Sequence, residues 1–208
     1  GLQKQAELTG VVKVEFIGAV SKGLEGKELA EMGDMAEAGV VAFSDDGHYV
    51  ENAAFMRRAL EYSSMFNKMV IDHAEDITLT KNGHMHEGIV SYELGVIGRP
   101  AVAEDLAVAR DILLSEMTGG HIHIAHVSSK NTVDMVRRAK AKGLNVTCEV
   151  TSQHLSFTDE YLREYNPAFK MAPPIRSEDH RQALLEGLKD GTIDAIITDH
   201  APHAFEEK

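Results

Sequence analysis

Residues 121–129 read HIHIAHVSS, a short apolar run that ends on His126 and is followed by small polar residues. Its length and its β-branched residues predict a buried strand over His121–His126. The next segment, Thr132–Lys142, has the apolar spacing of a helix, and Gly143 stands where the cap at the end of a helix is expected. Strand, polar turn and helix in this order form the unit that builds a parallel sheet covered by helices.

The same alternation recurs on both sides of this stretch. Further strands are expected at Val11–Ile17, Val40–Ser44, Met69–Asp72, Asn145–Val150 and Ala195–Thr198. Further helices are expected at Lys27–Ala38, Ala53–Phe66, Ala101–Met117 and Glu178–Lys189. No linker rich in Pro, Gly or Ser separates these elements, so we expect residues 1–208 to form a single domain. In the third helix, apolar residues at helical spacing are interpreted as core packing: Val102, Leu106, Ala109, Leu113 and Met117.

The position of the ionisable residues distinguishes an open parallel sheet from a closed barrel. Asp45–Asp46, His73, His126 and Asp199–His200 each follow a predicted strand, on four different strands. Barrel enzymes collect their catalytic groups at that end of the strands, whereas no glycine-rich phosphate loop follows the first strand to favour an open sheet. The expected fold class is therefore α/β, a partial (β/α)8 barrel with about six of its eight β/α units.

Composition and charge exclude several classes of function. The 208 residues carry 33 acidic and 21 basic side chains, and a formal net charge of −12 repels nucleic acid and anionic lipid. No apolar run approaches the roughly 20 residues that cross a bilayer, and the first ten residues lack the pattern of a secretory signal. The single Cys148 cannot form an internal disulfide. We expect a cytoplasmic protein that acts on a small molecule.

The four strand-end positions are candidate metal ligands. Histidine supplies a neutral nitrogen, and aspartate supplies oxygens that bind one ion or bridge two. Strand ends that face one mouth converge in space although they lie far apart in sequence, so the set is more informative than any member. For each histidine alone, a buried hydrogen-bonded role remains the alternative, and for Asp45–Asp46 the alternative is an Asx-type turn.

Five segments resemble the dihydroorotase family of the amidohydrolase superfamily, in that family's order and over essentially the whole chain. They are FSDDG (43–47), DHAED (72–76), HIAHVSS (123–129), KMAPPIR (170–176) and TDHAPH (198–203). The resemblance implies a barrel enzyme that closes N-carbamoyl-L-aspartate to L-dihydroorotate, or reopens it, in pyrimidine biosynthesis. It also implies a Zn²⁺ cofactor, with one or two ions in each active site.

Matching motif to motif assigns the residue roles that the resemblance implies. Asp46 resembles the carboxylate that bridges two metals, and it favours dihydroorotase over hydantoinases and allantoinases, where a carboxylated lysine is the bridge. His73 and His126 resemble the imidazole ligands of the second metal. Asp199 resembles the residue that contacts the first metal and, as the catalytic residue, carries the proton during ring opening and closure; His203 resembles a histidine that contacts substrate.

Three features depart from the family pattern. Ala172 stands at a substrate-binding position where many relatives have an asparagine. The pair His121 and His123 resembles the superfamily's HxH metal pair, but it lies at the start of its strand, so we interpret both residues as structural. His154 lies in a variant of the family's motif and is expected only in the neighbourhood of the site.

The family's HxHxR segment, which supplies two ligands to one metal, is not found in these residues. We therefore expect the chain to be part of a longer enzyme, and the 208 residues alone to be inactive. The resemblance also implies a homodimer or a complex with aspartate carbamoyltransferase. Two other functions remain open: another cyclic amidase, such as a dihydropyrimidinase, hydantoinase or allantoinase, or a noncatalytic homologue that serves as a scaffold for aspartate carbamoyltransferase.

Overall fold

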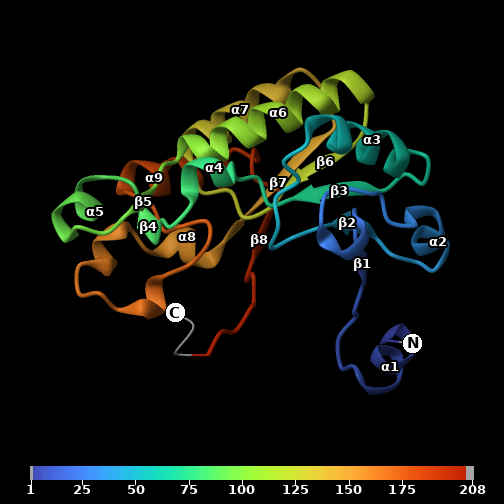
Figure 1. Cartoon of the computed structure of the whole chain (residues 1–208), viewed down its shortest axis with the longest axis horizontal. Helices are drawn as coiled ribbons and strands as arrows, with labels where there is room; N and C mark the ends of the chain where they lie inside the picture. The colour runs from blue at the N-terminus through green and yellow to red at the C-terminus, as the bar shows by residue number, and fades with distance from the viewer. Residues whose placement is uncertain (1, 205–208) are drawn as a thin grey trace.

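Six parallel strands form one curved sheet in the computed structural model, which describes residues 2–204. The sheet order is β1-β2-β3-β6-β7-β8, so neighbours in the sheet follow one another along the chain. Their bounds are Ile17–Gly18, Ala42–Ser44, Met69–Asp72, Ile122–Ile124, Val146–Thr151 and Ala195–Ile197. An open doubly wound sheet would reverse its strand order at a switch point. The uninterrupted order is that of a barrel, and the sheet forms part of one (Figure 1).

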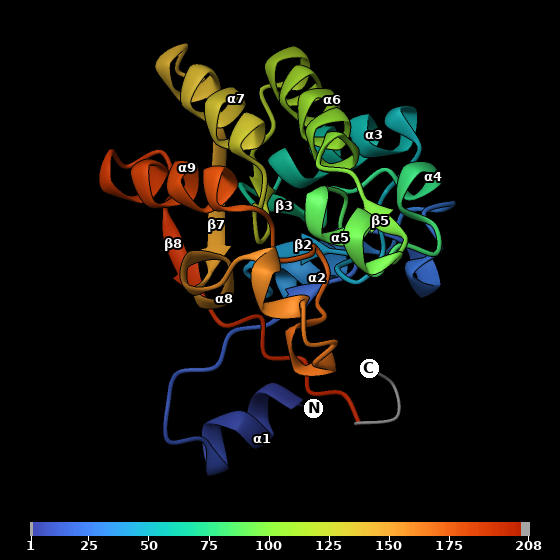
Figure 2. The same ribbon diagram turned by 90° about the vertical axis from the view of Figure 1, so that its left-hand side faces the viewer.

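Helices cover the convex face of the sheet, as Figures 1 and 2 show for α3, α6, α7 and α9. These span Ala53–Ser64, Val102–Thr118, Lys130–Ala141 and Glu178–Lys189, and the shorter α2 spans Met32–Glu37. Side-chain caps fix two of the starts: Asn52 accepts a hydrogen bond from the Phe55 amide at 3.0 Å, and Ser129 accepts one from the Asn131 amide at 3.3 Å.

The hydrophobic core lies between this convex face and the helices. Ile122 and Ile124 of β6 are fully buried in it, together with Phe43, Leu60 and Val136. Because side chains alternate along a strand, His121 and His123 point to the opposite, concave face. The strands therefore present an apolar layer to the helices and a polar layer to the inside of the barrel.

Several short elements lie outside the predicted pattern. They are α1 Leu2–Thr9, η1 Lys22–Leu24, α4 Ile77–Thr80, β4 Met85–His86, α5 Ile89–Leu94, β5 Gly98–Arg99, α8 Ser152–Ser156, η2 Asp159–Leu162 and η3 Pro167–Phe169. Most of them are too short for hydrophobic periodicity to identify. Strands β4 and β5 pair in parallel as a separate two-stranded sheet.

Two predicted elements at the beginning of the chain are wrong in extent. The strand expected over Val11–Ile17 is reduced to β1, because pairing with β2 begins only where the Phe16 carbonyl accepts a hydrogen bond from the Val41 amide. Val11 is 99% exposed, so its β-branched side chain packs against nothing. The helix expected from Lys27 begins only at Met32.

The apolar stripe of α6 was interpreted as core packing, and that interpretation is wrong. Its large members lie on the outer face, with exposed fractions of 47, 51, 63 and 56% for Val102, Leu106, Leu113 and Met117. The residues of α6 that are buried against the sheet and its neighbours α3 and α7 are smaller or polar: Ala103, Glu104, Ala107, Val108, Asp111 and Ser115. Ile112 and Leu114 are only partly buried against the core. Small residues let the helix approach its neighbours closely, so periodicity alone selected the wrong face.

Candidate metal centre and its pocket

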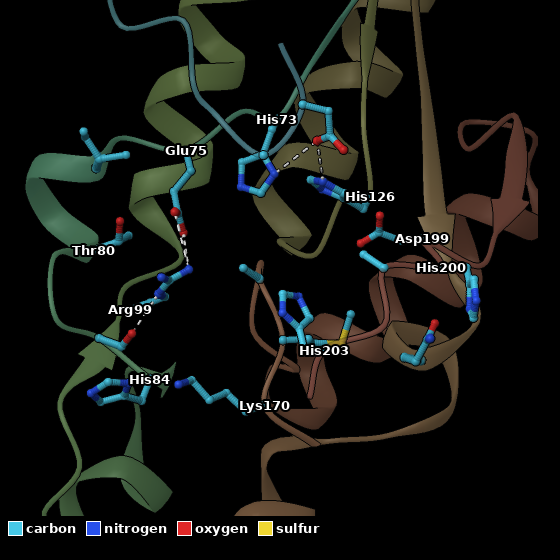
Figure 3. Close-up of a pocket in the computed structure, with 18 of the residues that line it drawn as sticks. His73, Glu75, Thr80, His84, Arg99, His126, Lys170, Asp199, His200 and His203 are labelled. Carbon is cyan, nitrogen blue, oxygen red and sulfur yellow. Dashed lines mark hydrogen bonds and ion pairs between the residues drawn. The ribbon is translucent and has the colours of Figure 1, made fainter. Parts of the chain in front are cut away.

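Three predicted ligands come together at the carboxyl ends of three strands. Asp46 follows β2, His73 follows β3 and His126 follows β6. One carboxylate oxygen of Asp46 lies 3.4 Å from Nδ1 of His73 and 3.5 Å from Nε2 of His126. The two imidazole rings meet edge to face with their centroids 4.5 Å apart. Figure 3 labels both histidines and marks these two contacts with dashed lines.

The turn after β2 presents Asp46 to the histidines because its neighbour Asp45 is engaged elsewhere. The buried Asp45 carboxylate accepts hydrogen bonds from the backbone amides of Val20 and Ser21 at 2.8 and 3.0 Å, and from the Ser21 hydroxyl. These bonds tie the turn after β2 to the segment after β1. Asp46 is left facing the concave side, about half exposed.

Arg110 of α6 stabilises the chain next to Asp46 and His73. Its guanidinium donates to Asp111 at 2.5 Å, lies 3.4 Å from Asp72, and donates to the carbonyls of Val50 and Glu51. Asp72 immediately precedes His73, and the two carbonyls belong to the loop that continues from Asp46. One cation therefore anchors the chain beside both of these ligands.

The electrostatics of the cluster favour a positive charge next to the Asp46 carboxylate. Hydrogen bonds that its carboxylate accepts from His126 and then from His73 hold the pKa of Asp46 far below its ordinary value. Burial alone would lower the pKa of His126, but the Asp46 carboxylate outweighs burial and raises it, with smaller contributions from Asp199 and Glu104. An ionised carboxylate in line with two nitrogen donors is a favourable environment for a positive charge.

The donor set fits a divalent metal ion. The three ligand atoms lie within 4.8 Å of one another. Donors placed tetrahedrally around Zn²⁺ at its usual bond lengths are about 3.4 Å apart, and the two distances to the Asp46 oxygen match that separation. Among residues 2–204 no other His, Cys, Asp or Glu joins such a group.

The fourth predicted ligand, Asp199, lies at the margin of this cluster. It is exposed, it follows β8 in the left-handed region with φ 47°, and it is not among the three grouped donors. It lines the same cavity of about 1000 Å³, as do the predicted substrate-binding residues His203 and Ala172. Figure 3 places Asp199 close to the His126 ring and His203 further out in the cavity.

The comparisons with known proteins place the chain in a family. A family profile described as Dihydro-orotase-like matches residues 2–132. A dihydroorotase of Pelotomaculum thermopropionicum is 55% identical over 205 residues, which are 99% of this chain and 48% of that protein. The chain belongs to the dihydro-orotase-like family. A dihydroorotase of Streptomyces coelicolor is 53% identical over 96% of this chain and 47% of its own length, so the chain spans about half the length of these relatives.

Solved structures of the superfamily share the fold. An L-hydantoinase (dihydropyrimidinase) from Arthrobacter aurescens superposes with a TM-score of 0.80 at 26% identity, over 100% of this chain and 48% of that chain. A dihydropyrimidinase from Brevibacillus agri superposes with a TM-score of 0.77 at 21% identity. The partial barrel predicted from the sequence is therefore confirmed, as is the resemblance to the dihydroorotase family. No helix within residues 2–204 has the length and apolar character needed to span a bilayer.

Within this dihydro-orotase-like site, several pocket residues were not predicted. Arg99 of β5 lies 3.4 Å from Glu75 and donates to the Gly83 carbonyl at 2.9 Å, on the wall opposite the metal cluster. Lys170 and His84 line the same wall (Figure 3). Glu75 and Lys170 belong to motifs quoted from the sequence, but β5 is only two residues long, so no sequence pattern marked Arg99.

His121, which precedes β6, and His123 within it make contacts of a structural kind. Nδ1 of His123 is 2.7 Å from the Thr147 hydroxyl, and its Nε2 is 3.2 Å from a carboxylate oxygen of Glu149. The His121 ring lies 2.9 Å from the same hydroxyl. Neither histidine belongs to the donor group found among the described residues. These contacts bind β6 to β7 across the inside of the sheet.

His154 lies behind the substrate side of the cavity and is almost fully buried. Its Nε2 is 3.1 Å from the Pro173 carbonyl, which can only accept, so that nitrogen carries the proton. Its Nδ1 lies 2.8 Å from the Thr151 hydroxyl. Burial lowers the pKa of His154 to about 4. The neutral ring thus joins α8 to the segment that carries Ala172.

This neutral histidine makes the fold sensitive to acid. Between pH 6.5 and 4 the unfolded chain binds a proton at residue 154 that the folded chain does not bind, so stability falls as the pH falls. The full loss is on the order of 3 kcal/mol. His154→Gln should flatten the dependence of the unfolding free energy on pH over this window, as measured by urea denaturation. The exposed His48→Gln is the matched control; a slope that is equal in both variants would contradict the assignment.

Proposed function

We propose that this chain is the metal-binding part of a zinc-dependent dihydroorotase, which interconverts N-carbamoyl-L-aspartate and L-dihydroorotate. The observation that carries the proposal is the convergence of Asp46, His73 and His126 at three strand ends, in a chain that belongs to the dihydro-orotase-like family. Relatives that are about half identical to it are named dihydroorotase. By the same resemblance the protein acts in pyrimidine biosynthesis and in the cytoplasm.

The proposed ligands are Asp46, His73 and His126, with Asp199 completing the site towards the cavity. When bound, zinc supplies a Lewis acid for the amide carbonyl and lowers the pKa of a water molecule. Asp46 is suited to hold the ion because its carboxylate stays ionised at any physiological pH. One or two ions are compatible with this assignment.

The remaining proposed steps belong to side chains that line the cavity. Asp199 accepts a proton from the attacking amide nitrogen during ring closure and returns one to the leaving nitrogen during ring opening. His203 and Ala172, which line the cavity, are the proposed substrate contacts. Substrate and product both carry carboxylates, and the cationic side chains that line this wall of an otherwise acidic chain are Lys170 and Arg99, the latter paired with Glu75.

Two other functions are less well supported. Another cyclic amidase, a dihydropyrimidinase, hydantoinase or allantoinase, is suggested by the solved structures, but these share only 20–26% identity with the chain. A noncatalytic scaffold would not need a carboxylate and two imidazoles within 4.8 Å of one another. We therefore favour dihydroorotase.

The test uses the protein expressed from its full coding sequence. It should interconvert L-dihydroorotate and N-carbamoyl-L-aspartate, and elemental analysis should find zinc. Turnover of dihydrouracil, hydantoin or allantoin in place of dihydroorotate would assign it to another cyclic amidase, and zinc without any turnover would support the scaffold. The 208 residues alone should turn over no dihydroorotate, because the described residues bring only three donors together.

For partners, we propose a homodimer on the strength of the family resemblance. Light scattering of the purified protein should give twice the mass of one chain. A mass of one chain that increases only when aspartate carbamoyltransferase is added would favour the heteromeric complex instead.

A further inference from the structure

A buried ion pair lies beneath the site and has no part in the proposed chemistry. Glu104, in the first turn of α6, and Arg176, the last residue of KMAPPIR, are 4 and 3% exposed. Oε2 of Glu104 lies 3.5 Å from Nη2 of Arg176. The two residues are 72 positions apart in sequence. Glu104 also contacts the side of the site that carries His126, and Arg176 contacts the side that carries Arg99.

Glu104 holds the turn that carries His126. Its Oε1 accepts hydrogen bonds from the backbone amides of Ser128 and Ser129 at 3.0 and 2.9 Å, and its Oε2 accepts one from the Ser128 hydroxyl. These serines follow His126 by two and three positions. His126 itself has φ 35°, a left-handed conformation that an L residue keeps only when its surroundings hold it there. The carboxylate of Glu104 supplies three of the bonds that do so.

Arg176 holds the wall opposite. Its Nη1 donates to the Arg99 carbonyl at 3.1 Å, at the end of β5, and lies 3.3 Å from Nδ1 of His86 on β4. Arg176 also ends the segment KMAPPIR, whose Lys170 and Ala172 line the cavity. The position of this guanidinium therefore sets the position of the wall where the substrate is proposed to bind.

The Ser128 hydroxyl bridges Glu104 and Arg176. It donates its single proton to Glu104 and accepts a hydrogen bond from Nε of Arg176 at 2.8 Å. Burial alone would raise the pKa of Glu104, but Arg176 and the serine donors lower it, so the carboxylate stays ionised. A buried ion pair adds little net stability compared with an apolar pair of the same volume. The several bonds to chain next to site residues indicate a different role.

We infer that Glu104 and Arg176 form a positioning pair. The pair fixes the turn that carries His126 relative to the cavity wall that carries Arg99 and Ala172, so that metal and substrate are held in one geometry. This inference rests on the proposed function for its metal and for its substrate. It explains the two serines of HIAHVSS and the arginine of KMAPPIR, which make no contribution to the ligand set. A change at either residue should therefore affect both walls.

The experiment measures the zinc Kd by chelator competition, together with KM, kcat and Tm, in the protein expressed from its full coding sequence. Glu104→Gln keeps the size of the side chain and removes its charge, and Arg176→Met removes the guanidinium. Each should raise the zinc Kd roughly 10-fold or more, as loss of a group that orients a metal ligand does. Each should also raise KM. The double variant should be no worse than the more severe single variant, because either change breaks the same link.

Two further variants separate positioning from simple loss of stability. Val136→Ala, on the buried face of α7, should lower Tm while the zinc Kd stays unchanged. Ser128→Ala removes the shared hydroxyl and leaves both charges in place. It therefore tests the link between Glu104 and Arg176 even if the charge variants do not fold. A zinc Kd in the Glu104, Arg176 and Ser128 variants no higher than that of Val136→Ala, or additive effects in the double variant, would overturn the inference.

The zinc Kd does not depend on the identity of the substrate. A protein that turned over another cyclic amide would refute the proposed function and leave the positioning pair standing. If the protein turned over dihydroorotate but its zinc Kd did not change in these variants, the proposed function would be supported and the positioning pair would be refuted.

Discussion

His73→Ala and His126→Ala should each weaken zinc binding by roughly 10²-fold or more in the protein expressed from its full coding sequence. Loss of a group that merely orients a metal ligand costs 10–100-fold, and each of these variants removes a nitrogen donor itself. Both nitrogens lie within 3.5 Å of the same Asp46 oxygen, so the two variants should have similar effects. Elemental analysis after dialysis against a weak chelator measures the outcome.

The matched control is His123→Ala, which removes a buried histidine from the concave face of the same sheet. Its ring contacts Thr147 and Glu149 and lies outside the donor group, so the bound zinc should not change. If His123→Ala lost zinc and His126→Ala retained it, the HxH pair at the start of β6 would be a metal site. The interpretation of that pair as structural would then be wrong.

The sequence was most informative where strands end. The turns after β2, β3 and β6 were located from apolar runs followed by Asp or His, and the structure brings those residues within 4.8 Å of one another. This succeeded because the carboxyl ends of parallel strands meet at one edge of a barrel, whatever the length of chain between them. Asp199 also follows a strand, yet it is exposed and is not among the three grouped donors.

Sequence patterns were least informative where packing between distant segments decides the outcome. The buried face of α6 carries Glu104 and Asp111, which no apolar periodicity would place in a core; they are there because Arg176 and Arg110 meet them. Arg99 reaches the cavity from a two-residue strand. Pairings of this kind across tens of residues depend on tertiary contacts that a single sequence does not display.

Asp199→Asn should slow turnover by roughly 10² or more and leave much of the metal bound. The asparagine keeps the size and one oxygen of the side chain, but it cannot accept a proton at accessible pH. Asp199 lies beside His126 at the open side of the cluster, where a group that exchanges protons with a substrate is needed (Figure 3). Because the three grouped donors do not include it, metal retention and catalytic rate should respond separately.

Steady-state assays in both directions, combined with elemental analysis, test this separation. KM should change much less than kcat, and the limb of the pH–rate profile that reports the catalytic base should disappear. His203→Gln is the comparison variant: as a substrate contact it should mainly raise KM. If Asp199→Asn kept a near-normal kcat and an unchanged pH profile while His203→Gln lost both, the proton would be carried by His203, and Asp199 would be only a ligand or a structural residue.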